Sequence, residues 1–224
     1  MKLGVLFSGG KDSYLAMHIA SETHELSCLL TINSSNPNSW MFHTPTIEWT
    51  KLQSQSLKIP QIIQNTKGVQ DKELDDLFEL IDKGKNQFSI EGVVTGALAS
   101  TYQSTRIQKI CNDLNLWCFN PLWQMSQKTL LEELLENNIE SIITGVAAEP
   151  FDDEWLGREI DLECINDLIK LKESHRINPA GEGGEIESFV VNAPLFNSRL
   201  EIIQSKIHYS NYSGTHDSNY SKKP

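Results

Sequence analysis

Short apolar runs alternate with longer stretches of helical periodicity along the first 120 residues. Runs of strand length and composition occupy residues 3–7, 26–32, 60–64, 92–95 and 117–119. Segments with a helical pattern lie between them, at residues 12–21, 46–57, 71–82 and 102–114. This alternation of strands and helices predicts an α/β fold with a mostly parallel sheet and helices on both of its faces.

The pattern changes after residue 123. We expect a helix over residues 129–136 with Ser126 as its N-cap, a strand over 139–146, a helix over 156–171 and a strand over 188–191. From residue 205 the composition turns to Ser, Asn, Tyr, His and Lys, which predicts a poorly ordered tail or a marginal last strand. We therefore divide the chain into residues 1–123 and a smaller C-terminal α/β domain, residues 124–224.

The most informative segment is residues 8–13, Ser-Gly-Gly-Lys-Asp-Ser, which directly follows the first expected strand. Two consecutive glycines let the backbone turn sharply and approach a ligand closely. The helix that begins near Asp12 points its free N–H groups and its positive dipole end at the same place. Three side chains add donors: Ser8, Lys11 and Ser13. The segment predicts a phosphate site at the carboxyl end of a strand, where such sheets bind ligands.

This segment differs from two common phosphate-binding loops. A Walker A loop has Lys after its second glycine and then Ser or Thr, whereas here Gly10 follows Gly9 and Asp12 follows Lys11. No third glycine completes the dinucleotide pattern. The hexapeptide instead resembles the PP-loop of the N-type ATP pyrophosphatases, which cleave ATP to AMP and pyrophosphate. A plain surface turn is the alternative, which the whole hexapeptide at the end of a strand disfavours.

The composition of the chain limits the classes of protein to which it can belong. The chain has 224 residues, of which 22% are charged and 39% hydrophobic, as in globular proteins. Its net charge of −11 disfavours unassisted binding to nucleic acid. No apolar stretch is long enough to span a bilayer, and the N-terminus reads as a strand of the fold rather than a signal peptide. The four cysteines form no C-x-x-C pair, so we expect free thiols and a cytoplasmic location.

A second signature lies at residues 180–185, Ala-Gly-Glu-Gly-Gly-Glu, followed by Glu187-Ser188-Phe189-Val190-Val191. Glycines around two carboxylates make a loop whose backbone can approach a ligand closely. Such carboxylates can bind a cation, orient an amine or accept a proton. An acidic surface turn is the alternative, because loops rich in glycine and charge are common.

With this signature the chain resembles the diphthine–ammonia ligase family of the adenosine-nucleotide alpha-hydrolases. The resemblance runs from residue 1 to about residue 200 and rests on residues 8–13, 41–44 (Met-Phe-His-Thr), 91–106, 154–158 (Glu-Trp-Leu-Gly-Arg) and 181–196. The glycine–glutamate loop followed by Phe-Val is its most selective part. Ser188 stands where the family carries Thr, which keeps the hydroxyl. The segment after His208 does not match a regular closing strand.

The resemblance implies a Rossmann-like, HUP-type fold with a PP-loop ATP-binding domain and a C-terminal substrate domain. It implies ATP-dependent amidation of diphthine, a modified histidine on elongation factor 2, with ammonium. The diphthine carboxylate would be activated as an acyl-adenylate with release of pyrophosphate, and ammonia would then displace AMP. ATP and Mg²⁺ are the implied cofactors, with Asp12 as the metal ligand because it is the only carboxylate of the PP-loop. A homodimer is left open.

The resemblance also implies roles for single residues. The predicted catalytic residues are Lys11, Asp12, Glu182 and Glu185. The predicted ATP-binding residues are Ser8, Gly9, Gly10, Lys11, Asp12, Ser13, His43, Gly96, Ser100 and Arg106. The predicted substrate-binding residues are Gly181, Glu182, Gly183, Gly184, Glu185 and Ser188. Two carboxylates repel a triphosphate unless Mg²⁺ lies between them, so we expect Glu182 and Glu185 on the acceptor side. The alternatives are a local structural role for His43, turn chemistry at Gly96 and Ser100, and a solvated charge at Arg106.

Two other functions stay open. A PP-loop pyrophosphatase acting on tRNA is disfavoured by the acidic balance and the missing C-x-x-C pair. A PP-loop pyrophosphatase acting on another acid is left open. A nucleotide-binding module without chemistry is disfavoured by the acidic glycine loop, which nucleotide sensing does not require.

Overall fold

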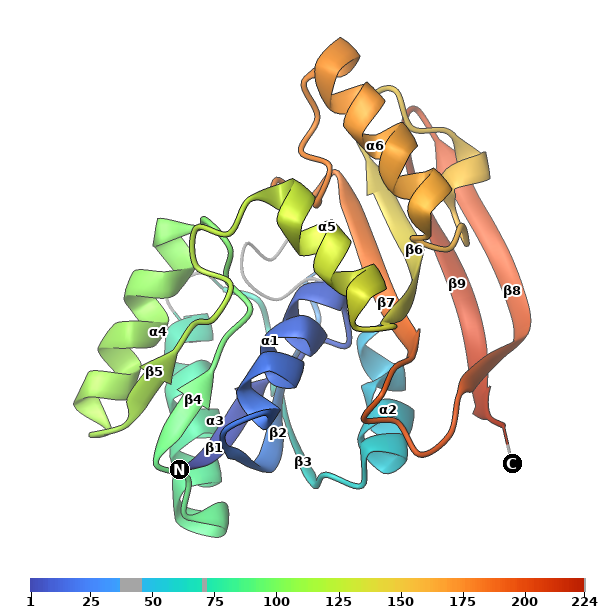
Figure 1. Ribbon diagram of the computed structural model, residues 1–224. Helices are drawn as coiled ribbons and strands as arrows, with labels where there is room; N and C mark the ends of the chain where they lie inside the picture. The colour runs from blue at the N-terminus through green and yellow to red at the C-terminus, as the bar shows by residue number, and fades with distance from the viewer. Residues whose placement is uncertain (37–45, 70–71, 224) are drawn as a thin grey trace.

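The computed structural model describes residues 1–36, 46–69 and 72–223, and it contains two sheets side by side (Figure 1). The first sheet has five parallel strands in the order β3-β2-β1-β4-β5. Their bounds are β1 Lys2–Leu6, β2 Glu25–Ser34, β3 Gln61–Thr66, β4 Gly92–Val94 and β5 Trp117–Phe119. The parallel α/β sheet predicted from the sequence is confirmed.

Helices cover both faces of this sheet because alternate strand residues point to opposite sides. Leu29 joins the apolar cluster of one face, to which α1 contributes, and Leu30 joins the cluster of the other face with α3 and α4. The helices of this half are α1 Lys11–Ser21, α2 Thr50–Leu57 after the short turn η1 Ile47–Trp49, α3 Lys72–Phe88 and α4 Thr101–Asp113.

The strand order places two loops together. Strands β1 and β4 are neighbours in the sheet, but the chain leaves β1 through α1 toward β2 and leaves β4 through α4 toward β5. The two connections diverge at the carboxyl ends of these strands, which is the switch point where parallel sheets bind ligands. Residues 8–13 and 96–100 follow β1 and β4 at this point.

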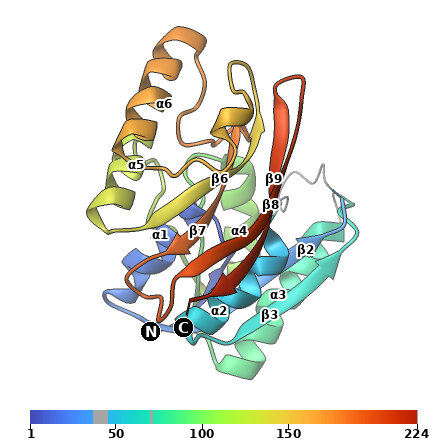
Figure 2. The ribbon, with the colours of Figure 1, turned by 90° about the vertical axis from the view of Figure 1, so that its right-hand side faces the viewer.

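The second sheet is antiparallel, with the order β7-β6-β9-β8. Its strands are β6 Glu140–Ala147, β7 Ile186–Asn192, β8 Leu200–Ser210 and β9 Ser213–Lys222, and its helices are α5 Gln127–Glu136, the short turn η2 Asp153–Trp155 and α6 Leu162–His175. Helices α5 and α6 lie on one face of this sheet and α2 on the other (Figure 2). The Ser126 hydroxyl accepts the Thr129 N–H at 3.1 Å, so the predicted cap of α5 is confirmed.

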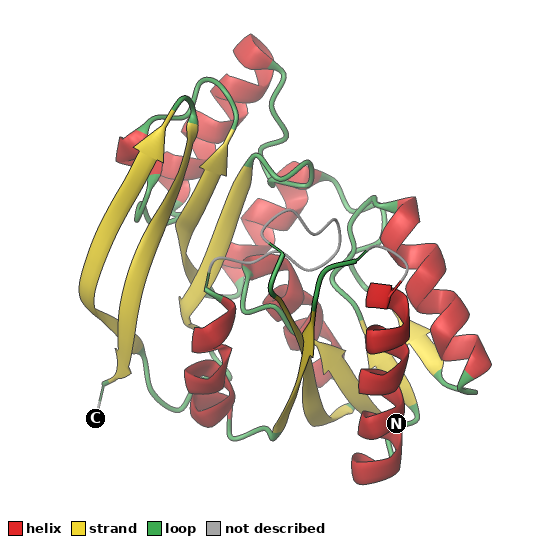
Figure 3. Cartoon of the chain, turned by 180° about the vertical axis from the view of Figure 1, so that it is seen from behind, coloured by secondary structure: helices red, strands yellow, loops and turns green. Residues whose placement is uncertain are grey.

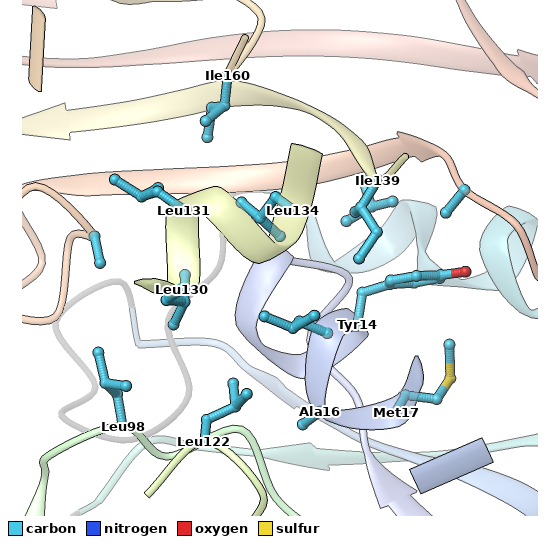
Figure 4. Close-up of a cluster of buried hydrophobic side chains, with 14 of the residues drawn as sticks. Tyr14, Ala16, Met17, Leu98, Leu122, Leu130, Leu131, Leu134, Ile139 and Ile160 are labelled. Atoms are coloured by element: carbon cyan, nitrogen blue, oxygen red, sulfur yellow. The ribbon is translucent and has the colours of Figure 1, made fainter. Parts of the chain in front are cut away.

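The largest apolar cluster extends from one sheet to the other. Figure 4 shows Tyr14 of α1 beside Ile139, which precedes β6, and Met17 of α1 and Leu134 of α5 belong to the same cluster. The Tyr14 hydroxyl also accepts the backbone N–H of Leu195 at 3.2 Å. The segments on either side of residue 123 therefore share one core, with α1 packed between the two sheets.

The structure corrects the expectation for the tail after residue 205. This part of the chain forms most of the β8–β9 hairpin, whose long strands lie at the outer side of the molecule (Figure 3). The strands were not apparent in the sequence because most of the hairpin is exposed and polar. Only every second residue of β9 is buried, at His216, Ser218 and Tyr220.

The structure also corrects the start of the helix expected over residues 156–171. Helix α6 begins at Leu162, where the Asp161 carboxylate accepts the Cys164 N–H at 2.8 Å as the N-cap. The residues before it run beside β6 instead, because Ile160 donates its N–H to the Ser141 carbonyl at 2.8 Å. Gly157, with φ at 88°, turns the chain into that path.

All four cysteines are free, as predicted, and Cys28, Cys111 and Cys164 are buried. Within the described ranges, none of the helices has the length and apolar character needed to cross a bilayer.

Candidate functional site

Residues 8–13 form a compact turn between β1 and α1. Gly9 has φ at 84°, and an added Cβ would lie 2.5 Å from the Gln53 side-chain oxygen, so only glycine fits there. The Ser13 hydroxyl donates to the Gly10 carbonyl at 3.0 Å and accepts from the Ser8 hydroxyl at 3.1 Å. These contacts fix the shape of the turn and bring four of the predicted residues together, Ser8, Gly9, Gly10 and Ser13.

The first turn of α1 presents unpaired amides. Within the described part of the chain, the N–H groups of Asp12 and Ser13 have no acceptor, as is usual for the first turn of a helix. A Cβ on Gly96 would lie 2.9 Å from the Ser13 nitrogen and 2.8 Å from the Asp12 carbonyl oxygen. The loop after β4 therefore packs directly on this turn. Amides and a helix dipole that converge at a switch point fit a phosphate group.

Lys11 joins the PP-loop to the C-terminal part of the chain. The residue is only 2% exposed, and its ammonium donates to the Ala180 carbonyl at 2.6 Å and to the Asp12 carboxylate at 2.9 Å. The Lys11 backbone N–H donates to the Ser188 hydroxyl at 3.2 Å. The hydroxyl at position 188 thus holds the start of α1, a contact for which a Thr hydroxyl is chemically equivalent.

The glycine–glutamate loop reaches the loop after β4. The Glu182 carboxylate accepts the N–H groups of Ala99 at 2.9 Å and Ser100 at 3.1 Å. It thereby supplies negative charge at the N-terminus of α4, where the Ser100 hydroxyl also caps the helix. Burial raises the pKa of the Glu182 carboxyl, and the Asp12 charge adds to the rise, while the two N–H bonds and the Lys11 charge oppose it.

Glu185 has a different environment. Its carboxylate accepts the N–H groups of Gly183 at 2.9 Å and Asn178 at 3.2 Å, both close to it in the chain. Within the described residues it makes no hydrogen bond to the PP-loop. Its contacts shape the loop, in which Gly181 and Gly184 have φ at 76° and 83°.

Among the described residues, Arg106 is a predicted ATP-binding residue whose printed contacts do not reach the PP-loop. The Arg106 guanidinium lies over the Tyr102 ring, 3.4 Å from its centroid, and donates to the Tyr102 carbonyl at 3.2 Å. Its role toward phosphate stays a prediction. His43 and the rest of the 41–44 motif lie outside the described residues.

Gln53 belongs to the site and was missed in the sequence. It is fully buried, and its amide donates to the carbonyls of Gly9 at 3.0 Å and Val190 at 2.8 Å. It therefore connects the PP-loop to β7. A signal was present, because Gln53 lies four residues after Trp49 and four before Leu57, on the apolar stripe of its helix.

Glu187 was also missed. It lies on β7 between Ile186 and Ser188, and its carboxylate has no hydrogen-bond or ion-pair partner among the described residues. Burial raises the pKa of this carboxyl to about 7; the Lys11 charge opposes the rise, and the Asp12 charge adds to it. The sequence signal for a functional residue was a single acidic side chain in a strand whose other residues are mostly apolar.

Across the part of the chain that the structure describes, no group of three His, Cys, Asp or Glu side chains is arranged to hold a metal ion. Asp12 as a ligand of Mg²⁺ beside phosphate oxygens therefore stays a prediction.

Two family models match almost the whole chain. The model of the diphthamide synthase N-terminal domain matches residues 1–117, and that of the diphthamide synthase C-terminal domain matches residues 126–223. The chain belongs to the diphthamide synthase family. Both signatures at the site, the PP-loop and the glycine–glutamate loop, lie inside the matched residues.

Relatives within the diphthamide synthase family are similar over most of the chain. The diphthine–ammonia ligase of Rattus norvegicus is 32% identical over 92% of this chain and 84% of its own length. That of Homo sapiens is 30% identical over 92% of this chain and 85% of its own length. The diphthine–ammonia ligase of Saccharomyces cerevisiae is longer: it is 32% identical over 91% of this chain but only 35% of its own length.

Proposed function

We propose that this protein is an ATP-dependent ligase that amidates diphthine with ammonium. The observation that carries the proposal is the junction of a PP-loop with the glycine–glutamate loop, through Lys11, Ala180 and Ser188, in a member of the diphthamide synthase family. A nucleotide-sensing module does not need this second loop at the phosphate end of the sheet.

The residues of the site fit ATP as the activating substrate. The free amides of Asp12 and Ser13 and the dipole of α1 stabilise the negative charge that develops on departing pyrophosphate. The diphthine carboxylate attacks the α-phosphorus and forms the acyl-adenylate, whose carbonyl carbon is open to ammonia. Lys11, held by Asp12 and Ala180, keeps a positive charge beside these phosphates. Mg²⁺ would neutralise further charge, with Asp12 as its protein ligand.

The acceptor side lies on the C-terminal half in this proposal. Elongation factor 2 carries the diphthine side chain, and the loop that contains Gly181, Glu182 and Gly184 binds it. Glu182 places this loop against the start of α4, and Glu185 holds its shape, so both act on the position of the acceptor. A cytoplasmic location accords with a cytoplasmic translation factor as substrate.

A product assay tests the proposal. Purified protein is mixed with ATP, Mg²⁺, ammonium and elongation factor 2 that carries diphthine, and amidation is followed by mass spectrometry together with AMP and pyrophosphate. We expect one AMP for each amide formed. Asp12→Asn and Ser13→Ala should reduce both products at least tenfold in protein whose circular dichroism is unchanged. AMP formation that requires tRNA or a small acid, and not the modified factor, would identify a different pyrophosphatase.

A further inference from the structure

The two carboxylates of the glycine–glutamate loop make different contacts. One oxygen of Glu182, Oε1, accepts the N–H groups of Ala99 at 2.9 Å and Ser100 at 3.1 Å, which lie 83 and 82 positions earlier in the chain. The hydrogen bonds of Glu185, at 2.9 and 3.2 Å, come from residues close to it in the chain. Of the two, Glu182 is therefore the one that joins the loop to the first half of the chain.

The residues that Glu182 holds end the loop between β4 and α4. Ser100 also caps α4, because its hydroxyl accepts the Gln103 N–H at 3.3 Å. Gly96, near the other end of this loop, packs on the first turn of α1, where an added Cβ would lie 2.9 Å from the Ser13 nitrogen. One short loop thus contacts the phosphate-binding end of α1 at Gly96 and the glycine–glutamate loop at Ser100.

A second contact holds the same part of the glycine–glutamate loop. The Ala180 carbonyl, two residues before Glu182, accepts the Lys11 ammonium at 2.6 Å. Gly181 lies between them with φ at 76°, and an added Cβ there would lie 2.5 Å from the Ile186 carbonyl oxygen. Only glycine fits this turn. The turn therefore connects the start of α1, through Ala180, to the start of α4, through Glu182.

We propose that Glu182 is a positioning residue that couples the binding of ATP to the binding of diphthine. The inference rests on the proposed function, in which the PP-loop end of the sheet binds ATP and the glycine–glutamate loop binds the acceptor. Both substrates favour the arrangement in which Glu182 holds Ala99 and Ser100, so each raises the affinity for the other. Such coupling is reciprocal because the two affinities belong to one thermodynamic cycle.

This role extends the expectation from the sequence, which placed Glu182 on the acceptor side alone. Its consequence is that ATP is held most tightly when the carboxylate that it activates is present.

The contact depends on the reach of the side chain more than on its charge. Both N–H groups donate to the same oxygen, and the side-chain carbonyl of glutamine offers one oxygen that accepts two hydrogen bonds at the same reach. Aspartate keeps the charge but is one methylene shorter. Glu182→Gln and Glu182→Asp therefore separate reach from charge with two conservative changes.

The test measures the coupling in the whole chain with α,β-methylene ATP, an analogue that cannot release pyrophosphate. Calorimetric titration gives its Kd without and with saturating elongation factor 2 that carries diphthine, and the first value divided by the second is the affinity ratio. We expect a ratio of at least about five in the wild type, at least about three in Glu182→Gln and below about two in Glu182→Asp.

Glu185→Gln is the matched control. It changes a carboxylate of the same loop that makes no hydrogen bond to Ala99 or Ser100. The affinity of Glu185→Gln for modified elongation factor 2 falls if the loop loses its shape, but its affinity ratio for the analogue should stay that of the wild type.

A second measurement separates positioning from catalysis. With ATP, ammonium and modified elongation factor 2 all saturating, the kcat of amidation in Glu182→Gln should stay within about threefold of the wild type. A fall of about a hundredfold or more, the scale of a lost general acid or base, would make Glu182 a catalytic residue and overturn the inference.

The outcomes also distinguish this inference from the proposed function. A wild-type affinity ratio near one, or a wild-type ratio retained in Glu182→Asp, would show that Glu182 does not couple the two substrates. If the wild type binds the analogue but neither binds nor amidates modified elongation factor 2, the proposed function itself fails.

Discussion

Several polar residues of the site are buried, and each is held by a contact that the chain makes far from it in sequence. Lys11 is held through the Ala180 carbonyl and Gln53 through the Val190 carbonyl. Buried polar groups need such partners because an unmet hydrogen bond costs about 1–3 kcal/mol. Glu187 is only partly buried and has no such partner among the described residues. At Gly96 it is the absence of a side chain that matters, because the loop after β4 packs directly on α1 there.

We expect Gly96→Ala to weaken ATP binding at least tenfold, which corresponds to about 1.4 kcal/mol. The added Cβ would meet the backbone of Asp12 and Ser13 at 2.8–2.9 Å and push the loop after β4 away from α1. Calorimetric titration with ATP measures the change. Thr105→Ala, on the exposed side of α4, serves as the control. Wild-type affinity in Gly96→Ala would show that this close packing does not shape the ATP site.

Glu187→Gln should change the pH dependence of stability. The folded-state pKa of Glu187, about 7, lies above the ordinary value of 4.5, so the folded protein favours the neutral carboxyl and loses stability as pH rises from about 4.5 through 7. The amide cannot ionise. In the protein without ligands, Glu187→Gln should exceed the wild-type free energy of unfolding by about 1–3 kcal/mol at pH 8, and the difference should vanish toward pH 4.

Urea unfolding at pH 4, 6 and 8 measures this difference, and Glu173→Gln, which removes an exposed carboxylate from α6, is the control. If the free energies of unfolding of Glu187→Gln and the wild type differed by the same amount at all three pH values, this would contradict a raised pKa at Glu187.

At the scale of helices and strands, local sequence patterns were sufficient to predict the first sheet but not the β8–β9 hairpin. Most of the parallel strands are short apolar runs, and the PP-loop follows one of them directly, so both the sheet and the loop could be predicted. Strand β8 is exposed along nearly its whole length and pairs only locally with β9. Its sequence lacks the alternation that burial imposes. The start of α6 was placed too early because Gly157 and the segment beside β6 interrupt an apolar pattern that reads as continuous.

Strand β8 is an edge of the second sheet and carries exposed isoleucines, so it favours self-association. Ile203 is 67% exposed and Ile207 is 45% exposed. We expect Ile203→Lys to reduce concentration-dependent association, because a charge on an edge strand opposes pairing with another strand. The free energy of unfolding should change by no more than about 0.5 kcal/mol. Light scattering over a range of protein concentrations measures the effect.

Ile203→Val keeps an apolar side chain at this position and should associate like the wild type. A wild-type protein that is monomeric at every concentration would contradict the prediction.

At the scale of the molecule, the two sheets form one site as well as one core. The PP-loop comes from the first sheet, but its Gly9 carbonyl accepts the Val190 N–H of the second at 3.0 Å. The sequence predicted the two signatures separately and gave no means of joining them, because contacts between residues so far apart leave no periodic trace. For the same reason Gln53 and Glu187 were not recognised, although both lie in segments that were read correctly.

Gln53→Met should show how strongly the two sheets are connected. The substitution keeps the length of the side chain and removes the donor to Gly9 and Val190, so two buried carbonyls lose a partner. We expect the free energy of unfolding to fall by about 2–4 kcal/mol and ATP affinity to fall with it. Gln55→Met changes an exposed residue of the same helix and is the matched control. If Gln53→Met and Gln55→Met were equally stable, the hydrogen bonds of Gln53 would contribute little to the free energy of unfolding.

The contact between Lys11 and Ser188 can form only after the ribosome has synthesised both residues. The two residues are 177 positions apart, and a ribosome adding about 5–20 residues each second needs about 9–35 seconds to pass from one to the other. Over that interval the nascent chain carries a phosphate loop whose supporting strand does not yet exist. Chains that terminate before β7 is synthesised therefore lack the strand contact that holds this loop, and on the proposed function they cannot use ATP.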